Sequence, residues 1–208
     1  NQIENAIKID QFEGEKDTSI TLYIGGTIKK IYLLGLGDKK EFSTDMARSC
    51  GSNLMRFINE NKVANVLIDA ESLGLSKDNF SQSFSEGLVL GSYVFDDYKT
   101  DKDKEIKLVD LTFSGKVNSK ALETGQALGE AVCFSRDLGN HPANILTPTY
   151  LAKAAKKISD NSDNMECNIV DGKDLKKMGM GAFYGVARGA KEPAKMIIVK
   201  YDGGKKSQ

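Results

Sequence analysis

The sequence is poor in the residues that mark membrane proteins and disulfide-rich proteins. It has no tryptophan, one histidine, three prolines and three cysteines among 208 residues. Cys50, Cys133 and Cys167 are far apart and lack CxxC spacing, which argues against a disulfide framework and favours a reducing compartment. No apolar run approaches the roughly 20 residues that cross a bilayer, and no signal peptide is visible. We therefore expect a cytoplasmic protein with no membrane partner.

The scarcity of histidine limits the catalytic chemistry that can be assigned. His141 lies beside a proline, where a lone histidine is more often a turn residue than a ligand or a base. With one histidine we assign no Ser-His-Asp or Cys-His arrangement. Asp96 and Asp97 are consecutive, so at a helix end they would point apart and form no acid/base pair. Asp101 and Asp103 fall in a charged loop and indicate a solvated surface.

Charge is balanced overall but not along the chain. Residues 1–118 carry 15 basic and 19 acidic side chains, a net charge of −4, whereas residues 119–208 carry 14 basic and 10 acidic, a net charge of +4. Neither half has the strongly basic character of a nucleic-acid-binding surface, so we expect no nucleic-acid partner. The opposite signs indicate two structural units.

The spacing of apolar residues predicts helices and strands in alternation. Helices are expected at residues 44–60, 78–97, 119–137, 148–158 and 174–178. Strands are expected at residues 7–12, 19–24, 30–34, 65–70, 104–113, 166–170, 182–187 and 194–201. The runs 31–34 and 196–199 are continuously apolar, as in strands buried on both faces. This alternation predicts an α/β layered fold.

Two segments have the composition of linkers. Residues 99–105 form a charged loop, and residues 114–119 are typical of an exit from a first domain. We therefore expect a first domain over residues 1–118, a linking helix over 119–138 and a second domain over 139–208.

Three glycine-rich segments lack the context of a phosphate site. Gly35-Leu36-Gly37 follows a strand without the third glycine of GxGxxG, and predicts a tight strand-to-helix turn. Residues 179–185 lie between a helix and a strand, the reverse of the order that phosphate binding needs, and predict a helix C-cap followed by a strand. Residues 203–207 lack the GK[ST] adjacency, and Asp202 alone cannot hold a divalent ion.

The most distinctive stretch is residues 135–158, SRDLGNHPANILTPTYLAKAAKKI. Gly139 and Asn140 tolerate positive φ and predict a helix end. Thr147 and Pro148 predict the N-cap and first position of the next helix. That helix carries an apolar stripe made of Leu151, Ala154, Ala155 and Ile158, while Lys153, Lys156 and Lys157 face water. By local chemistry alone this is a domain-joining corner without a nucleophile or a metal cage.

This stretch resembles the signature at the domain junction of leucyl aminopeptidases, the cytosolic two-metal peptidases of family M17. The matching residues are Arg136-Asp137-Leu138, Asn140-x-Pro142-Ala143-Asn144 and Leu146-Thr147-Pro148-x-x-Leu151-Ala152. Residues 86–99 resemble the helix that closes the family's N-terminal domain, and residues 174–203 look like the start of its catalytic domain. The likeness covers residues 80–204. Residues 188–190, Arg-Gly-Ala, depart from a more usual Gly-Ser pair at a position that carries no chemistry in the family.

The resemblance implies an α/β fold with a macro-like N-terminal domain (a mixed sheet flanked by helices), a linking helix and the first part of an α/β catalytic domain. It implies a hydrolase that acts on peptide substrates as a hexamer. Two divalent ions, zinc, manganese or magnesium, would polarise the scissile carbonyl and activate a water. The family's metal ligands lie in segments of the kind VGKGxxFDxGG and NTDAEGR, and neither segment occurs here.

We therefore carry over no catalytic, metal-binding or substrate-binding residue to this sequence. We expect the chain to be the N-terminal part of a leucyl aminopeptidase, without peptidase activity or bound metal of its own. The first residue is asparagine rather than methionine, so we also expect a trimmed or engineered chain.

Two alternatives stay open. A macro-like domain could hold ADP-ribose or a nucleotide in a glycine-lined cleft, with Gly25-Gly26 and Gly35-Leu36-Gly37 as candidate loops. A non-catalytic assembly role would use the oppositely charged halves and an exposed apolar strand edge at residues 194–201.

Overall fold

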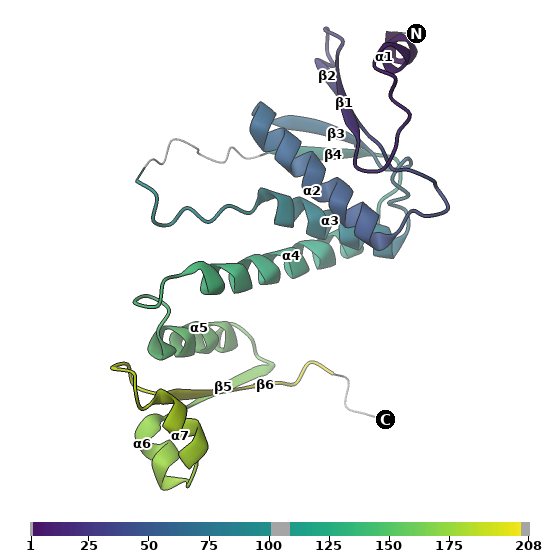
Figure 1. Cartoon of the computed structure of the whole chain (residues 1–208). Helices are drawn as coiled ribbons and strands as arrows, with labels where there is room; N and C mark the ends of the chain where they lie inside the picture. The colour runs from purple at the N-terminus through teal and green to yellow at the C-terminus, as the bar shows by residue number, and fades with distance from the viewer. Residues whose placement is uncertain (1, 101–108, 205–208) are drawn as a thin grey trace. The chain divides into compact units, whose positions relative to one another are not determined.

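The computed structural model describes residues 2–100 and 109–204 (Figure 1). The chain forms two compact units, Asn1–Ser135 and Arg136–Gln208, called unit 1 and unit 2 below. The boundary between them falls inside helix α4 (Ser119–Asn140). The domain borders expected after residues 118 and 138 stay predictions. None of the helices in the described part of the chain is both long enough and apolar enough to span a membrane.

Unit 1 confirms the α/β class. Its elements are α1 (Gln2–Ile9), β1 (Ser19–Tyr23), β2 (Lys30–Leu34), α2 (Thr44–Asn61), β3 (Asn65–Asp69), α3 (Asp78–Ser92), β4 (Asp110–Ser114) and most of α4. β1 and β2 pair antiparallel, with Ser19 opposite Leu34. β3 and β4 pair parallel, with Asn65 opposite Asp110, and α3 lies in the connection between them, as parallel pairing requires a crossover.

The core of unit 1 forms where α2 and α3 pack with the strands. Its buried members are Cys50, Leu54, Ile58, Ile68, Ala70, Leu75, Phe84 and Leu88. Phe84 is fully buried and meets Phe113 of β4 edge to face, with ring centroids 6.4 Å apart. Because the cluster draws on two helices and a strand pair, burial of its apolar surface stabilises the tertiary structure rather than any one element.

Small residues allow α2 and α3 to approach each other closely. A Cβ atom added at Gly51 would overlap the carbonyl oxygen of Phe84, and one added at Gly87 would overlap that of Arg48. The guanidinium Nε of Arg48 also donates to Glu86 across this contact at 3.0 Å, which raises the pKa of Arg48. Gly51 and Gly87 therefore allow the two helix backbones to lie close together.

Unit 2 consists of the end of α4, α5 (Pro148–Asp160), β5 (Met165–Asp171), α6 (Gly172–Lys177), α7 (Gly181–Ala187) and β6 (Lys195–Tyr201). β5 and β6 pair antiparallel, with Met165 opposite Tyr201. Figure 1 shows α5 along one side of this strand pair and α6 and α7 on the other side. The amide N–H of Gly172 donates to the carbonyl of Ala194 at 3.0 Å, which ties the start of α6 to the strand pair.

Two expected strands are helices. Residues 7–12 contribute to the end of α1 and the turn after it, and residues 182–187 belong to α7. In α1 the apolar positions Ile3, Ala6 and Ile7 have helical spacing, with Glu4 in the first turn and Lys8 in the last, a charge order that favours a helix. The strands were predicted from isoleucines and aromatic residues, which are common in strands. This prediction was wrong because β-propensity depends strongly on context and is outweighed here by the helical spacing of the apolar residues.

Two further expectations need correction. The helix expected over residues 78–97 ends at Ser92, because Tyr93 is extended, so Asp96 and Asp97 lie outside it. The continuously apolar runs are not buried on both faces: β2 is half-buried, and Ile198 of β6 remains 41% exposed. The charged loop at residues 99–105 lies mostly outside the described residues.

Candidate functional site

The junction between α4 and α5 has the predicted caps. The hydroxyl of Thr147 accepts the amide N–H of Tyr150 at 3.2 Å, and Pro148 occupies the first helical turn. The carbonyl of Pro142 accepts the amide N–H groups of Ile145 and Leu146 at 2.8 and 2.9 Å, which forms the turn between the helices. α4 ends at Asn140, three residues beyond the expected end at residue 137, and neither Gly139 nor Asn140 has a positive φ there.

His141 lies in this turn and contacts Tyr150 of α5. Its ring meets the ring of Tyr150 edge to face, with centroids 5.5 Å apart, and its Nε2 lies 3.5 Å from the Tyr150 hydroxyl. Its amide N–H donates to the carbonyl of Asp137 at 3.0 Å, which completes the end of α4. The described contacts of His141 thus join the end of α4 to the start of α5.

The glycine loops are explained by the path of the chain. Gly25 and Gly26 have φ values of 80° and 88° in the turn between β1 and β2. Gly35 donates its amide N–H to the carbonyl of Thr18 at 2.8 Å, and a Cβ there would overlap the carbonyl of Glu15. A hollow of about 390 Å³ lies between α1 and β1, lined by Ile3, Ala6, Thr21, Leu22, Tyr23 and Ile24. None of the candidate glycines lines it.

The expected strand after Gly179 is absent, although the helix end there is correct. α6 ends before Gly179, whose φ of 74° takes the chain out of the helix. The chain then enters α7 instead of a strand. The glycines of α7, Gly181 and Gly185, have open space where a Cβ atom would lie.

The described residues do not provide the donor set of a two-metal centre. Among residues 2–100 and 109–204, no three histidine, cysteine, aspartate or glutamate side chains lie close enough together to hold a metal ion. Cys50 is buried in the core of unit 1, and burial raises the pKa of its thiol to about 11. It therefore stays protonated at neutral pH, where a thiol is a poor nucleophile and a poor metal ligand.

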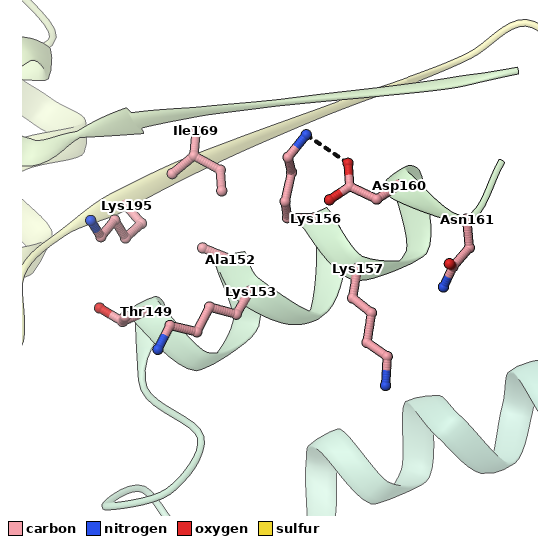
Figure 2. Close-up of a pocket in the computed structure, with 9 residues that line it drawn as sticks. All are labelled: Thr149, Ala152, Lys153, Lys156, Lys157, Asp160, Asn161, Ile169 and Lys195. Atoms are coloured by element: carbon pink, nitrogen blue, oxygen red, sulfur yellow. Dashed lines mark ion pairs between the residues drawn. The ribbon is translucent and has the colours of Figure 1, made fainter. Parts of the chain in front are cut away.

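A further hollow lies in unit 2, along α5. It is a groove of about 520 Å³ lined by Thr149, Ala152, Lys153, Lys156, Lys157, Asp160, Asn161, Ile169 and Lys195 (Figure 2). Ala152 is 4% exposed and forms its floor with Ile169 of β5. Figure 2 shows Lys156 and Lys195 on the strand side of α5, whereas Lys153 and Lys157 extend away from the strands.

Two lysines of the groove are already paired. Lys156 Nζ lies 2.7 Å from an oxygen of Asp160, a contact that raises the pKa of Lys156. Lys195 pairs with Asp171 at the end of β5. The sequence predicts that the three lysines of α5 face water, but it gives no sign that Lys195 lies beside them. The spacing of the three α5 lysines predicts a basic helix face. Lys195 lies near them because the β5–β6 strand pair packs against α5.

Comparisons with known proteins agree on one family. The model of the cytosol aminopeptidase family's N-terminal domain matches residues 1–102, and that of its catalytic domain matches residues 133–208. A protein of Alkaliphilus oremlandii named "Probable cytosol aminopeptidase" is 33% identical over 99% of this chain and 43% of its own length. The chain thus spans less than half the length of the curated relatives that it matches.

Solved structures give the same result. A tomato leucine aminopeptidase mutant matches with a TM-score of 0.82 and 28% identity, over 99% of this chain and 42% of its own. The structure named "Bottromycin maturation enzyme BotP in complex with Mn" matches with a TM-score of 0.81 over 95% of this chain and 42% of its own; at 22% identity it shows the fold alone. The chain therefore belongs to the cytosol aminopeptidase family, and it corresponds to the N-terminal part of the family's proteins.

Proposed function

We propose that this chain is the N-terminal part of a metal-dependent aminopeptidase that removes N-terminal residues from peptides in the cytoplasm. The observation that carries the proposal is the order of the two family matches, in which the N-terminal domain precedes the beginning of the catalytic domain on one chain. The name of the Alkaliphilus relative supports the enzyme class, and the manganese of the BotP complex supports a divalent metal.

The chemistry of such an enzyme needs metal ligands that the described part of this chain does not bring together. Two divalent ions, zinc, manganese or magnesium, would polarise a peptide carbonyl and activate a water when bound. A divalent ion of this kind needs several converging oxygen or nitrogen ligands. Because the described residues form no such group, we assign the reaction to the whole protein. Within it, this chain would provide the N-terminal domain, which is macro-like by family resemblance, and the first strand pair of the catalytic domain.

The test compares this chain with the product of its whole reading frame. Purified residues 1–208 with Mn²⁺ should release no p-nitroaniline from leucine p-nitroanilide, whereas the product of the frame read past Gln208 should do so in a chelator-sensitive manner. Metal-dependent turnover by the 208-residue chain would refute its inactivity. A whole protein without metal-dependent turnover would refute the proposed activity.

The whole protein is proposed to be a hexamer, by the family resemblance. Size-exclusion chromatography with light scattering on the whole protein tests this directly, and a monomer at all concentrations would contradict it. The same measurement on residues 1–208 tests the alternative assembly role, which predicts association that grows with concentration.

The nucleotide-binding alternative gains no support from a specific contact. Its candidate glycines lie in turns and line neither of the two hollows described above. Calorimetric titration of residues 1–208 with ADP-ribose should therefore give no binding heat, and saturable heat would restore this alternative.

A further inference from the structure

The groove along α5 is long enough for an extended stretch of peptide. Its lining residues recur along α5 from Thr149 in the first turn to Asn161 just beyond the last. At a rise of 1.5 Å per residue this stretch is about 18 Å long. An extended chain advances by about 3.3 Å per residue, so about five residues would fill the groove from end to end.

The groove carries a surplus of positive charge. It has four lysines, and the two aspartates that face them, Asp160 and Asp171, each pair with one lysine. No ion pair is found for Lys153 or Lys157 among the residues that the structure describes. The groove therefore has a net charge of +2, on a unit that carries 13 basic and 8 acidic side chains.

The floor of the groove is apolar. Ala152 and Ile169 line the groove together with its lysines, whose methylene stems add further apolar surface. An inorganic polyanion would pair with the ammonium groups and leave this floor in water. A chain with alternating acidic and apolar side chains would cover the floor and gain hydrophobic energy in addition to charge pairing.

We propose that the lysine-rimmed groove of unit 2 binds an extended acidic peptide segment. Its apolar side chains would lie against Ala152 and Ile169, and its carboxylates beside Lys153 and Lys157. The proposal does not depend on peptidase activity, because every residue that carries it lies within unit 2 of this chain.

The test is fluorescence anisotropy with a labelled five-residue peptide of alternating glutamate and leucine, titrated with residues 1–208. We expect saturable binding that weakens as salt is added, since the charges are exposed. The double variant Lys153→Gln/Lys157→Gln should bind about five- to tenfold more weakly, as expected for the loss of two exposed charge pairs. The control Lys173→Gln/Lys176→Gln removes the same charge from α6, outside the groove, and should leave binding unchanged.

Two matched peptides separate charge from the apolar floor. Replacing each glutamate by glutamine should abolish measurable binding, and replacing each leucine by serine should weaken it. Absence of binding by the original peptide, or equal losses in the groove variant and the α6 control, would overturn the proposal. So would a short single-stranded DNA that binds more tightly through Lys153 and Lys157, because the groove would then select polyanions. A failed peptidase assay would change none of these results.

Discussion

The two units bury their apolar residues to very different degrees. Unit 1 has an eight-residue core that includes fully buried Phe84 and Leu75 and nearly buried Ile58. Among the described residues of unit 2, the buried positions are Ala152, Ser159, Gly172 and Leu175. Leu175 is therefore the one large apolar side chain that is fully buried in the described part of unit 2. Since apolar burial is the main stabilising contribution, unit 1 should be the more stable unit and unit 2 should open first.

Exposed apolar residues in unit 2 complete the contrast. Leu151, Ile158, Phe183, Ile198 and Val199 each keep between 40% and 45% of their surface exposed. The strand pair and α5 are held instead by backbone pairing, caps and surface ion pairs. Surface ion pairs contribute little to folding stability. Substitutions that remove core volume should therefore act strongly in unit 1 and weakly in unit 2.

The largest effect is expected for Phe84→Ala. Phe84 is completely buried, and removing a buried aromatic ring costs about 3–5 kcal/mol of unfolding free energy. The control Phe183→Ala removes a ring that is 45% exposed in α7 and should cost about 0.5 kcal/mol. Urea unfolding gives both values, and hydrogen exchange by mass spectrometry assigns the loss to a unit. Equal costs for the two rings would contradict the contrast in packing.

A second pair of variants uses glycines in helices. Gly87→Ala places a methyl group against the carbonyl of Arg48 and should destabilise unit 1 by about 1–3 kcal/mol, because the helices must move apart. Gly185→Ala adds the same group to α7 in open space and should stabilise that helix by up to about 1 kcal/mol. Opposite shifts in urea midpoint are expected. An unchanged urea midpoint for Gly87→Ala would show that α2 and α3 are not packed through this glycine.

The third pair compares helix caps. Thr147→Ala removes the oxygen that accepts the Tyr150 amide N–H at 3.2 Å and should cost about 1 kcal/mol. The corresponding contact of Ser43 at the start of α2 is longer, 3.4 Å, and Met46 and Ala47 of that first turn are buried. Ser43→Ala should therefore cost less. We expect Thr147→Ala to speed hydrogen exchange in the first turn of α5, and Ser43→Ala to leave exchange in the first turn of α2 unchanged. Thr147→Ser should restore the protection of α5.

How much the sequence predicted depended on how local the signal was. The cap at Thr147 and the periodic apolar spacing over residues 44–60 predicted the starts of α5 and α2 correctly, because each signal lies within one or two turns. The predictions for the segments that form α1 and α7 were wrong, because segments of eight and seven residues contain too few periods to separate helix from strand. The family resemblance, which the comparisons confirm, rested on residues in sequence order and needed no geometry.

The groove could not be predicted because it depends on distant pairings. Lys195 and Asp171 are 24 residues apart and meet because β5 and β6 pair antiparallel in one register. A shift of β6 by one residue against β5 would turn Lys195 to the other face, away from Asp171. Ile169 reaches the floor for the same reason. The sequence indicated which residues were basic but not which of them would share a surface.

The smallest effect is expected at the end of β3, where Asp69 holds a turn. The hydroxyl of Ser72 donates to one oxygen of Asp69 at 2.5 Å, and the amide N–H of Glu71 donates to the other at 3.1 Å. The Ser72 hydrogen bond is the main cause that lowers the pKa of Asp69 below its usual value. Asp171, at the end of β5 in unit 2, instead pairs with Lys195.

A carboxyl group with a lowered pKa in the folded state contributes stability above the unfolded pKa, about 3.9 for aspartate, and loses it as pH falls through the folded value. Ser72→Ala should therefore lower the urea midpoint slightly at pH 6, and the difference from the unsubstituted chain should vanish near pH 2. Because Asp69 is exposed, solvent keeps this difference small. A difference that persists unchanged at pH 2 would mean that Ser72 stabilises the turn without the Asp69 charge, and that this turn responds as little to pH as the apolar core of unit 1.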